Sequence, residues 1–307
     1  MLKRKHLLGL RAVEREEITE ILDTASQLKQ VLYAPSKKSA HLTGKSIVTL
    51  FYENSTRTRM SFELACKYLS AASANITASG SSVQKGETLI DTGRTLDMMG
   101  TDIIIMRHPM SGAPRLLAQN VNASVINAGD GMNEHPTQAL LDMYTMRDKL
   151  GELKGLNVAI IGDVLHSRVA RSNLWGLTTM GASVTFCGAP TLLPEEFGLC
   201  GARICYNIKQ AVKDADVVMG LRIQRERQQA GLFPSVREYN SFYALTDEVM
   251  ALARRDALVM HPGPMNRGVE INTSVADSPA SVINEQVANG VAVRMALMYM
   301  LTRRNGL

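Results

Sequence analysis

Three hydroxyl side chains and two arginines occupy five consecutive positions, Ser55 to Arg59, two residues after the apolar run 47–52. In isolation such a stretch is typical of a solvated helix start, because Ser and Thr are favourable N-caps. After a strand, the same residues could bind an anion, since a helix N-terminus has unpaired N–H groups and a partial positive charge. Arg57 adds a fork that matches phosphate oxygens. Arg59 points elsewhere on a helix, and we expect it to pair with a local acid.

The common phosphate-binding loops do not match this chain. A Walker loop before Gly44, Lys45 and Ser46 would require glycine where Ser39 stands, and these residues precede their strand instead of following it. The apolar run 157–162 ends in glycine, but no G-x-G-x-x-G pattern follows it.

Further polar groups stand at the ends of other apolar runs. Arg107 closes one run, and the segment 133–138 follows the next. Pro136 is favoured at a first helical position, so His135 lies just before a predicted helix. A single histidine there is more often a structural hydrogen-bonding group than a catalyst. The Gly/Ser-rich loop 79–87 carries Lys85, and such loops are usually surface connectors.

The elements that position these residues alternate between strands and helices. Near-continuous apolar runs predict parallel strands covered on both faces, at 46–53, 101–107, 123–129, 157–163, 182–188, 216–220 and 257–263. Between them lie amphipathic helices. One has an apolar stripe formed by Phe62, Ala65, Cys66 and Leu69. The pattern predicts βαβ units and the α/β class.

The length of 307 residues suggests about two domains, each large enough to bury a core without disulfides or metals. The charged, glycine-containing stretch 147–156 is the strongest candidate boundary by composition, and it follows a predicted helix over 136–146. A last helix is predicted near 284–304. One face of it carries Val287, Val291, Met295 and Met298.

Composition favours a soluble cytoplasmic enzyme with free thiols. Hydrophobic residues make up 45% and charged residues 21%, and the four cysteines are Cys66, Cys187, Cys200 and Cys205. No run approaches the ~18 apolar residues that span a membrane, and the N-terminal apolar run is too short for a signal peptide. The net charge is +5, but Lys and Arg are scattered and no nucleic-acid motif is present. Arginines gathered around an anionic small molecule account for the charge equally well.

Five segments resemble the aspartate/ornithine carbamoyltransferase family, most closely its aspartate-specific catalytic chains: STRTRMSFE, SSVQKGET, MRHP, NAGDGMNEHPTQALLD and MHPGPMNRGVEI. The resemblance covers essentially the whole chain. It implies transfer of the carbamoyl group of carbamoyl phosphate to L-aspartate in pyrimidine biosynthesis (the UMP pathway), without metal or organic cofactor.

The resemblance also implies two Rossmann-like domains, each a parallel sheet flanked by helices. Residues 1–136, joined by the C-terminal helix 285–307, would bind carbamoyl phosphate, and residues 137–284 would bind aspartate. Ser81 and Lys85 would reach a neighbouring subunit's site, so the family implies a homotrimer with active sites at its subunit interfaces.

Site residues follow from the same resemblance. The carbamoyl phosphate site would contain Ser55, Thr56, Arg57, Thr58, Ser81, Arg107, His135, Gln138, Gly263 and Pro264. The aspartate site would contain Lys85, Arg168, Arg222 and Gln224. The catalytic set would be Arg57, Thr58, Lys85, Arg107 and His135. Arg107 would contact phosphate and carbonyl oxygen, and Thr58 and His135 would form an oxyanion hole. Gln138 and the backbone carbonyls of Gly263 and Pro264 would contact the carbamoyl amino group.

Two alternatives remain beside the aspartate reading. An ornithine carbamoyltransferase would carry H-P-C-Q and H-C-L-P, where this chain has His-Pro-Thr-Gln at 135–138 and His-Pro-Gly-Pro at 261–264. A catalytically silent carbamoyl phosphate binder or scaffold should lose Arg107, His135 or the carboxylate-binding arginines, and all are present.

Gly263 marks one departure, because the enteric-type members have leucine at this position. A backbone carbonyl is required there, so the chemistry is retained. The segment resembles the bacterial branch that lacks the enteric type of regulatory chain, and a dihydroorotase or another accessory chain is a possible partner. Cys200 and Cys205 are predicted to be packing thiols, not metal ligands.

Overall fold

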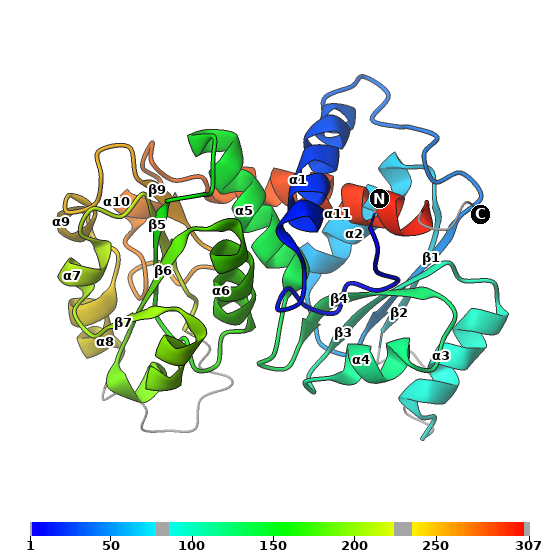
Figure 1. The fold of residues 1–307 in the computed structure, drawn as a ribbon, viewed down its shortest axis with the longest axis horizontal. Helices are drawn as coiled ribbons and strands as arrows, with labels where there is room; N and C mark the ends of the chain where they lie inside the picture. The colour runs from blue at the N-terminus through cyan, green and yellow to red at the C-terminus, as the bar shows by residue number, and fades with distance from the viewer. Residues whose placement is uncertain (1, 78–85, 224–234, 304–307) are drawn as a thin grey trace. The chain divides into compact units, whose positions relative to one another are not determined.

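The computed structural model describes residues 2–77, 86–223 and 235–303. The chain divides into two compact units, Met1–Leu141 with Val287–Leu307 and Asp142–Gln286 (Figure 1). Each unit contains one parallel sheet flanked by helices, which confirms the predicted fold class.

The first unit is built on a four-stranded parallel sheet of order β2-β1-β3-β4. Its strands are β1 (Ser46–Phe51), β2 (Ala72–Thr77), β3 (Ile103–His108) and β4 (Ser124–Asp130). Its complete helices are α1 (Arg15–Lys29), α2 (Thr56–Tyr68), α3 (Leu89–Met98) and α4 (Ala113–Ala118), with a short 3₁₀ turn at Gln30–Leu32. Helix α11 (Ile283–Thr302) belongs to this unit from Val287 onward.

Helices cover both faces of this sheet because its side chains alternate between two apolar layers. Val48, Leu50, Ile104 and Met106 pack with Leu96 of α3 and Leu117 of α4 in one cluster. The intervening residues point to the opposite face, on which α1, α2 and α11 lie (Figure 1). Parallel strands covered in this way bring their carboxyl ends to a single edge of the sheet.

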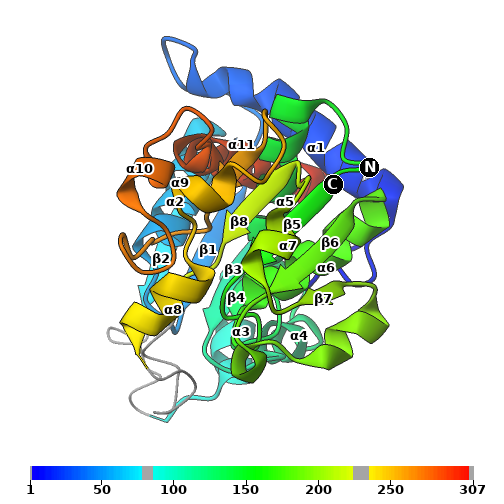
Figure 2. The ribbon, with the colours of Figure 1, turned by 90° about the vertical axis from the view of Figure 1, so that its left-hand side faces the viewer.

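The second unit is built on a five-stranded parallel sheet of order β7-β6-β5-β8-β9 (Figure 2). Its strands are β5 (Asn157–Ile161), β6 (Ser183–Cys187), β7 (Arg203–Cys205), β8 (Val217–Gly220) and β9 (Leu258–Met260). Its helices are α6 (Arg168–Met180), α7 (Ile208–Val212), α8 (Val236–Tyr243), α9 (Asp247–Met250) and α10 (Thr273–Ala276), with 3₁₀ turns at Pro190–Leu192 and Glu195–Cys200. Helix α5 (Pro136–Leu150) belongs to this unit from Asp142 onward.

All seven predicted strands are present, and two further strands, β2 and β7, were not predicted. Both lie at the outer edge of their sheets. Four of the six residues of β2 are exposed, so its sequence lacks the apolar run that marks the central strands. Strand β7 has only three residues.

The last helix differs from the predicted single apolar face. Residues 291–298 of α11 are buried at every position, including Arg294, whereas Val287 is 55% exposed. The helix packs on α2, where Arg294 Nη1 donates to Ser61 Oγ at 2.7 Å and Cys66 Sγ lies 3.7 Å from Met298 Sδ. Because α11 is enclosed, its apolar residues surround the helix instead of forming a stripe.

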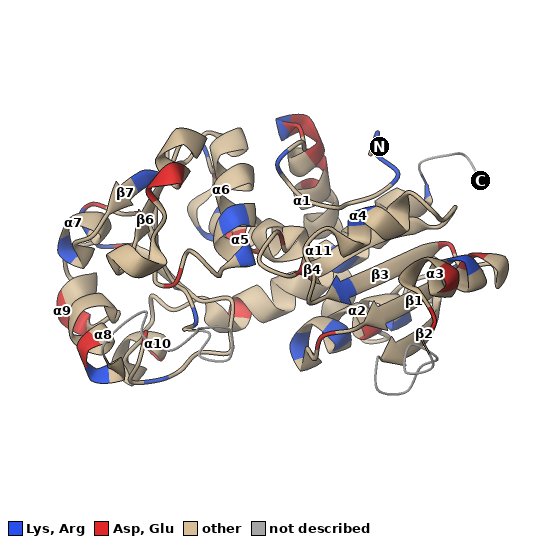
Figure 3. Cartoon of the chain, turned by 90° about the horizontal axis from the view of Figure 1, so that it is seen from below, with Lys and Arg blue, Asp and Glu red and all other residues tan. Residues whose placement is uncertain are grey.

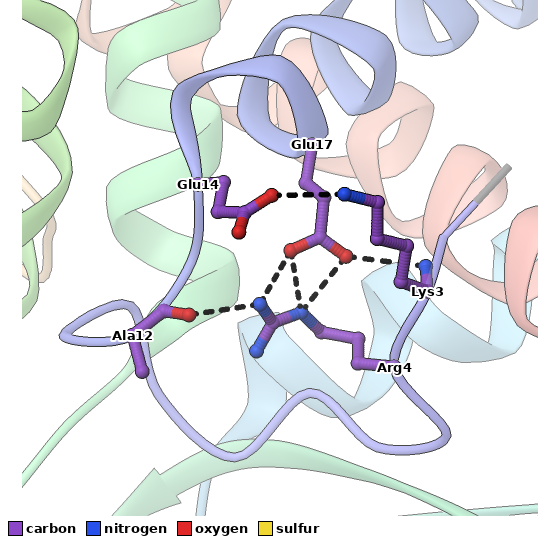
Figure 4. A network of polar contacts seen from close by, with 5 residues as sticks. All are labelled: Lys3, Arg4, Ala12, Glu14 and Glu17. Atoms are coloured by element: carbon purple, nitrogen blue, oxygen red, sulfur yellow. Dashed lines mark hydrogen bonds and ion pairs between the residues drawn. The ribbon is translucent and has the colours of Figure 1, made fainter.

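A polar network ties the N-terminal segment to α1 (Figure 4). Arg4 forms an ion pair with Glu17, and its Nη2 also donates to Ala12 O at 2.9 Å. The backbone N–H of Lys3 donates to Glu17 Oε1 at 3.2 Å. The Glu17 side chain is only 5% exposed, so Arg4 compensates a nearly buried carboxylate.

Charged residues of both signs are interspersed along the chain (Figure 3). All four cysteines are free; Cys66, Cys187 and Cys205 are buried and Cys200 is half-buried. Cys187 and Cys205 belong to the core of the second unit. For Cys205 this agrees with the predicted role of a packing thiol. None of the helices in the described ranges has the length and apolarity needed to cross a membrane.

Candidate active site

In the first unit, the predicted anion site lies where strand β1 gives way to helix α2. Ser55 is the N-cap residue, with an extended backbone (φ −158°, ψ 93°), and α2 begins at Thr56. Arg57 is exposed, whereas Thr58 is only 8% exposed. Arg59 Nε lies 3.6 Å from Glu63 Oε1, which confirms the expected pairing with a local acid. The helix N-terminus therefore presents Arg57 to solvent and holds Arg59 along its side.

Arg107 comes from the neighbouring strand, β3, at the same sheet edge. It lies opposite Phe51 in the β1–β3 register. Its Nη2 donates to Glu53 Oε1 at 2.7 Å and its Nη1 to Ala128 O at 3.2 Å. With 9% of the residue exposed, these contacts fix a largely buried cation beside the start of α2.

His135 comes from the segment between β4 and α5, and Gln138 from the first turn of α5. Pro136 is the first residue of α5, as predicted, and His135 is 4% and Gln138 8% exposed. The Thr137 hydroxyl lies 3.5 Å from His135 Nδ1. Donation from this hydroxyl would place the imidazole hydrogen on Nε2, where it can be offered to an acceptor.

Two carboxylates build the loop before His135. Asp130 accepts from Gly112 N at 2.7 Å and from Glu134 N at 3.1 Å. Glu134 accepts from Leu10 N at 2.7 Å. These bonds anchor the segment between β4 and α5 to the rest of the unit, and so fix the backbone position of His135.

His108 also stands near this sheet edge, but its bonding differs. Its Nδ1 accepts from Met110 N at 3.0 Å. Burial lowers the pKa of His108, although the bond from Met110 and the charges of Asp130 and Glu53 act the other way. A neutral His108 that is bonded to its own loop is suited to shaping the loop, not to proton transfer.

In the second unit, Arg168 stands at a strand-to-helix turn, as predicted. It is the first residue of α6, whose N-cap Ser167 accepts from Ala170 N. Arg168 is 5% exposed. Before it, His166 Nδ1 lies 2.9 Å from Asp163 Oδ1, which closes the turn after β5.

Arg222 and the segment 261–264 follow the next two strands of the same sheet. Arg222 lies two residues beyond β8, directly after Leu221, whose N–H donates to Ile161 O at 2.8 Å. Gly263 and Pro264 follow β9, and their peptide bond is cis. Because β5, β8 and β9 are neighbours, Arg168, Arg222 and the Gly263–Pro264 segment gather at one sheet edge.

Three predicted site residues, Ser81, Lys85 and Gln224, lie outside the described residues. Within the described ranges, no group of three or more His, Cys, Asp or Glu side chains could hold a metal ion.

The sequence-based prediction missed the acids that hold the site residues in place. Glu53 binds Arg107, Asp130 and Glu134 hold the loop before His135, and Glu270 lies beside His261. Each stands inside or next to a segment already singled out. Their positions in the sequence could therefore have identified these acids as candidates. The sequence does not show, however, which residue each side chain contacts.

Comparisons with known proteins assign both halves of the chain. Residues 5–148 match the family model "Aspartate/ornithine carbamoyltransferase, carbamoyl-P binding domain", and residues 154–301 match "Aspartate/ornithine carbamoyltransferase, Asp/Orn binding domain". The chain is 66% identical over 303 residues to an aspartate carbamoyltransferase catalytic subunit from Ruminiclostridium cellulolyticum, covering 99% of this chain and 97% of that protein.

Solved structures agree on the fold. An aspartate transcarbamoylase from Trypanosoma cruzi, in complex with carbamoyl phosphate and aspartate, is 30% identical with a TM-score of 0.86, covering 97% of each chain. An ornithine carbamoyltransferase from Pyrococcus furiosus is also 30% identical, with a TM-score of 0.85 and 95% of each chain covered. Similarity of structure thus does not separate aspartate from ornithine, whereas the 66% identity is to a subunit of aspartate specificity.

Proposed function

Because the chain belongs to the aspartate/ornithine carbamoyltransferase family, we propose that it transfers the carbamoyl group of carbamoyl phosphate to L-aspartate. The products are N-carbamoyl-L-aspartate and phosphate. The observation that carries this proposal is the near-full-length identity to an aspartate-specific catalytic subunit. The aspartate amine forms a C–N bond to the carbamoyl carbon, and the carbonyl electron pair moves to oxygen. The tetrahedral intermediate then breaks its C–O bond to phosphate, and the nitrogen loses a proton.

The edge of the first unit supplies donors for the carbamoyl phosphate half. Ser55, Thr56 and Arg57 stand at the N-terminus of α2, where an anion is favoured, and we assign them to the phosphate. Arg107 is held by Glu53 next to this helix start and is assigned to phosphate and carbonyl oxygen. Thr58 and His135 are assigned as donors to that oxygen, whose negative charge grows in the transition state. Gln138 is assigned to the carbamoyl amino group.

The edge of the second unit supplies the groups for aspartate. L-Aspartate carries two carboxylates, and Arg168 and Arg222 each offer a fork suited to bidentate contact. Gln224 is assigned to the same substrate. The carbonyls of Gly263 and Pro264 are assigned as acceptors for the carbamoyl amino group.

The functional division of the chain is part of the proposal. Residues 1–136 with 285–307 would bind carbamoyl phosphate, and 137–284 would bind aspartate. Ser81 and Lys85 would complete the site of the next subunit in a homotrimer, with Lys85 neutralising phosphate and aspartate together. The enzyme would work in the cytoplasm in pyrimidine biosynthesis, and a dihydroorotase is a candidate accessory chain.

Substrate choice tests the proposal directly. Ureido product is measured with carbamoyl phosphate and either L-aspartate or L-ornithine. The cationic tail of ornithine would meet Arg168 or Arg222, and juxtaposed like charges cost several kcal/mol. We therefore expect kcat/KM for ornithine to be lower by about three orders of magnitude or more.

Comparable kcat/KM values for the two amino acids would reject the aspartate assignment. Carbamoyl phosphate binding without any ureido product would instead support a silent binder. Arg168→Ala and Arg222→Ala should each raise KM for aspartate, since each removes one carboxylate contact.

A further inference from the structure

The segment assigned to the carbamoyl amino group is held by a buried histidine that the mechanism above does not use. His261 follows β9 directly, and its Nδ1 accepts from Gly263 N at 2.8 Å. Gly263 has a φ of 61°, a left-handed conformation that glycine adopts without strain. The imidazole therefore fixes the amide N–H of Gly263, the residue whose own carbonyl is assigned to the substrate.

The other ring nitrogen faces a buried acid. His261 Nε2 lies 3.3 Å from Glu270 Oε1, and the two side chains are 0% and 1% exposed. Because Nδ1 is an acceptor, the ring hydrogen is on Nε2, which lies within ion-pair distance of the carboxylate but outside hydrogen-bond geometry. A carboxylate that orients a histidine in this way sets its tautomer.

Glu270 is itself fixed at the far end of the loop. Its carboxylate accepts from the backbone N–H and the side-chain amide of Asn266. The backbone O of Glu270 accepts from Leu245 N at 3.0 Å. The loop 261–270 is thus closed on itself by one carboxylate, with His261 at its start and Asn266 in its middle.

A second arm ties His261 to the helix that begins with Arg168. His261 N donates to Gln286 Oε1 at 3.0 Å, and Gln286 Nε2 donates to Asp142 Oδ1 at 2.8 Å. Asp142 Oδ2 in turn accepts from Asn173 Nδ2 of α6 at 2.8 Å. All these side chains are at most 3% exposed, so solvent does not compete for the bonds.

The ring also fits tightly against the sheet. A Cβ added at Gly220, the last residue of β8, would lie 3.3 Å from His261 Cδ2. Glycine at this position leaves room for the imidazole beside β8. The ring is therefore fixed by packing and by the hydrogen bond at Nδ1, with Nε2 beside the Glu270 carboxylate.

We propose that His261, oriented by Glu270, is a positioning residue that holds the Gly263 carbonyl for the amino group of carbamoyl phosphate. The inference rests on the proposed function, because that function assigns the Gly263 carbonyl to this amino group. It predicts selectivity for an acyl phosphate that carries an amino group over one that carries a methyl group.

Two substitutions separate the two ring nitrogens. In His261→Asn, the side-chain oxygen can take the place of Nδ1 and still accept from Gly263, while the contact with Glu270 is lost. In His261→Gln, the longer amide reaches toward Glu270, but the acceptor for Gly263 is lost. Both variants remove the same buried ring, so a merely structural role would affect them alike.

The probes are phosphonoacetamide and acetonylphosphonate, which differ only in an amide nitrogen against a methyl group. Binding of each to the full-length protein is measured by calorimetry, with thermal unfolding as the check on folding. We expect wild type to prefer phosphonoacetamide. His261→Gln should reduce that preference by about 5- to 30-fold, the value of one net hydrogen bond or two, and His261→Asn should keep it within about 3-fold.

Equal preference in wild type for the two probes would overturn the proposal, as would an unchanged preference in His261→Gln. If His261→Gln does not fold, His261→Leu replaces it, because leucine also removes the acceptor for Gly263 N, and a full wild-type preference in that variant would equally overturn the proposal. Failure of the proposed function is distinguishable, because it shows as absence of ureido product in wild type, whereas the probes are measured without aspartate.

Discussion

Arg107→Ala should cost both stability and catalysis, in amounts that the structure separates. The substitution removes the charged bond to Glu53 at 2.7 Å and the bond to Ala128 O at 3.2 Å. A hydrogen bond to a charged group contributes about 1.5–3 kcal/mol and a neutral one about 1 kcal/mol. We expect unfolding to become easier by about 2–4 kcal/mol, which leaves a domain of ordinary stability folded.

The catalytic loss should be much larger. Arg107 is assigned two charge-assisted contacts, to phosphate and to the carbonyl oxygen, which together stabilise the transition state by about 3–6 kcal/mol. Each 1.36 kcal/mol of lost transition-state stabilisation lowers the rate tenfold, so kcat/KM for carbamoyl phosphate should fall by about 10²- to 10⁴-fold. The assay is ureido formation under saturating aspartate, at a temperature where circular dichroism shows the variant to be folded.

Arg4→Ala is the matched control, because Arg4 is also an arginine paired with a shielded glutamate. Its loss leaves Glu17, at 5% exposure, with the backbone N–H groups of Lys3 and Glu14 but without its cationic partner, and should destabilise by about 3 kcal/mol. Turnover per folded molecule should stay at the wild-type level. Activity of Arg107→Ala within tenfold of wild type, or an equal loss in Arg4→Ala, would refute the assigned role.

Three further outcomes are expected. Arg57→Ala and Lys85→Ala proteins, each nearly inactive, should recover about one quarter of wild-type activity when they are denatured, mixed equally and refolded. The reason is that a shared site needs one native residue from each chain. No recovery, despite hybrid trimers in native mass spectrometry, would place Lys85 in its own chain's site. Burial tends to raise the pKa of Glu17, but the bond and charge of Arg4 outweigh it and lower that pKa below 4.5. The stability from this pair should therefore be complete above pH 4.5 and be lost as pH falls further, which urea midpoints measured with and without Arg4→Ala would show. Burial raises the pKa of Cys66 to about 12, so iodoacetamide at pH 8 should alkylate this thiol only after unfolding, as peptide mass mapping can test.

The central sheet strands were predictable because burial on both faces leaves a continuous apolar run. A strand at the edge of a sheet is less buried, so its sequence lacks this continuous apolar run. Strand β2 pairs with β1 alone and exposes most of its side chains, so its sequence ASANIT is not distinguishable from a loop. Burial on all sides likewise explains α11. Its residues 291–298 are buried all around the helix, whereas an apolar stripe on one face was expected.

The positions of Arg107 near a strand end and of Arg168 at a helix start were predictable from local order. The groups that orient them were not. Glu270 reaches His261 from nine positions further along the chain, and Asp142 reaches Gln286 from a different helix, 144 positions away. Such pairings depend on how the loop and helices pack, which spacing along the chain does not encode.

The discontinuous first unit has a consequence for synthesis on the ribosome. Its sheet is complete by Asp130, yet Ser61 and Cys66 meet their partners, Arg294 and Met298, only when α11 has been made. The second unit, Asp142–Gln286, is continuous and is finished earlier. During translation the later-encoded unit can therefore complete its core first, while the earlier-encoded unit keeps one apolar face open until α11 has been made.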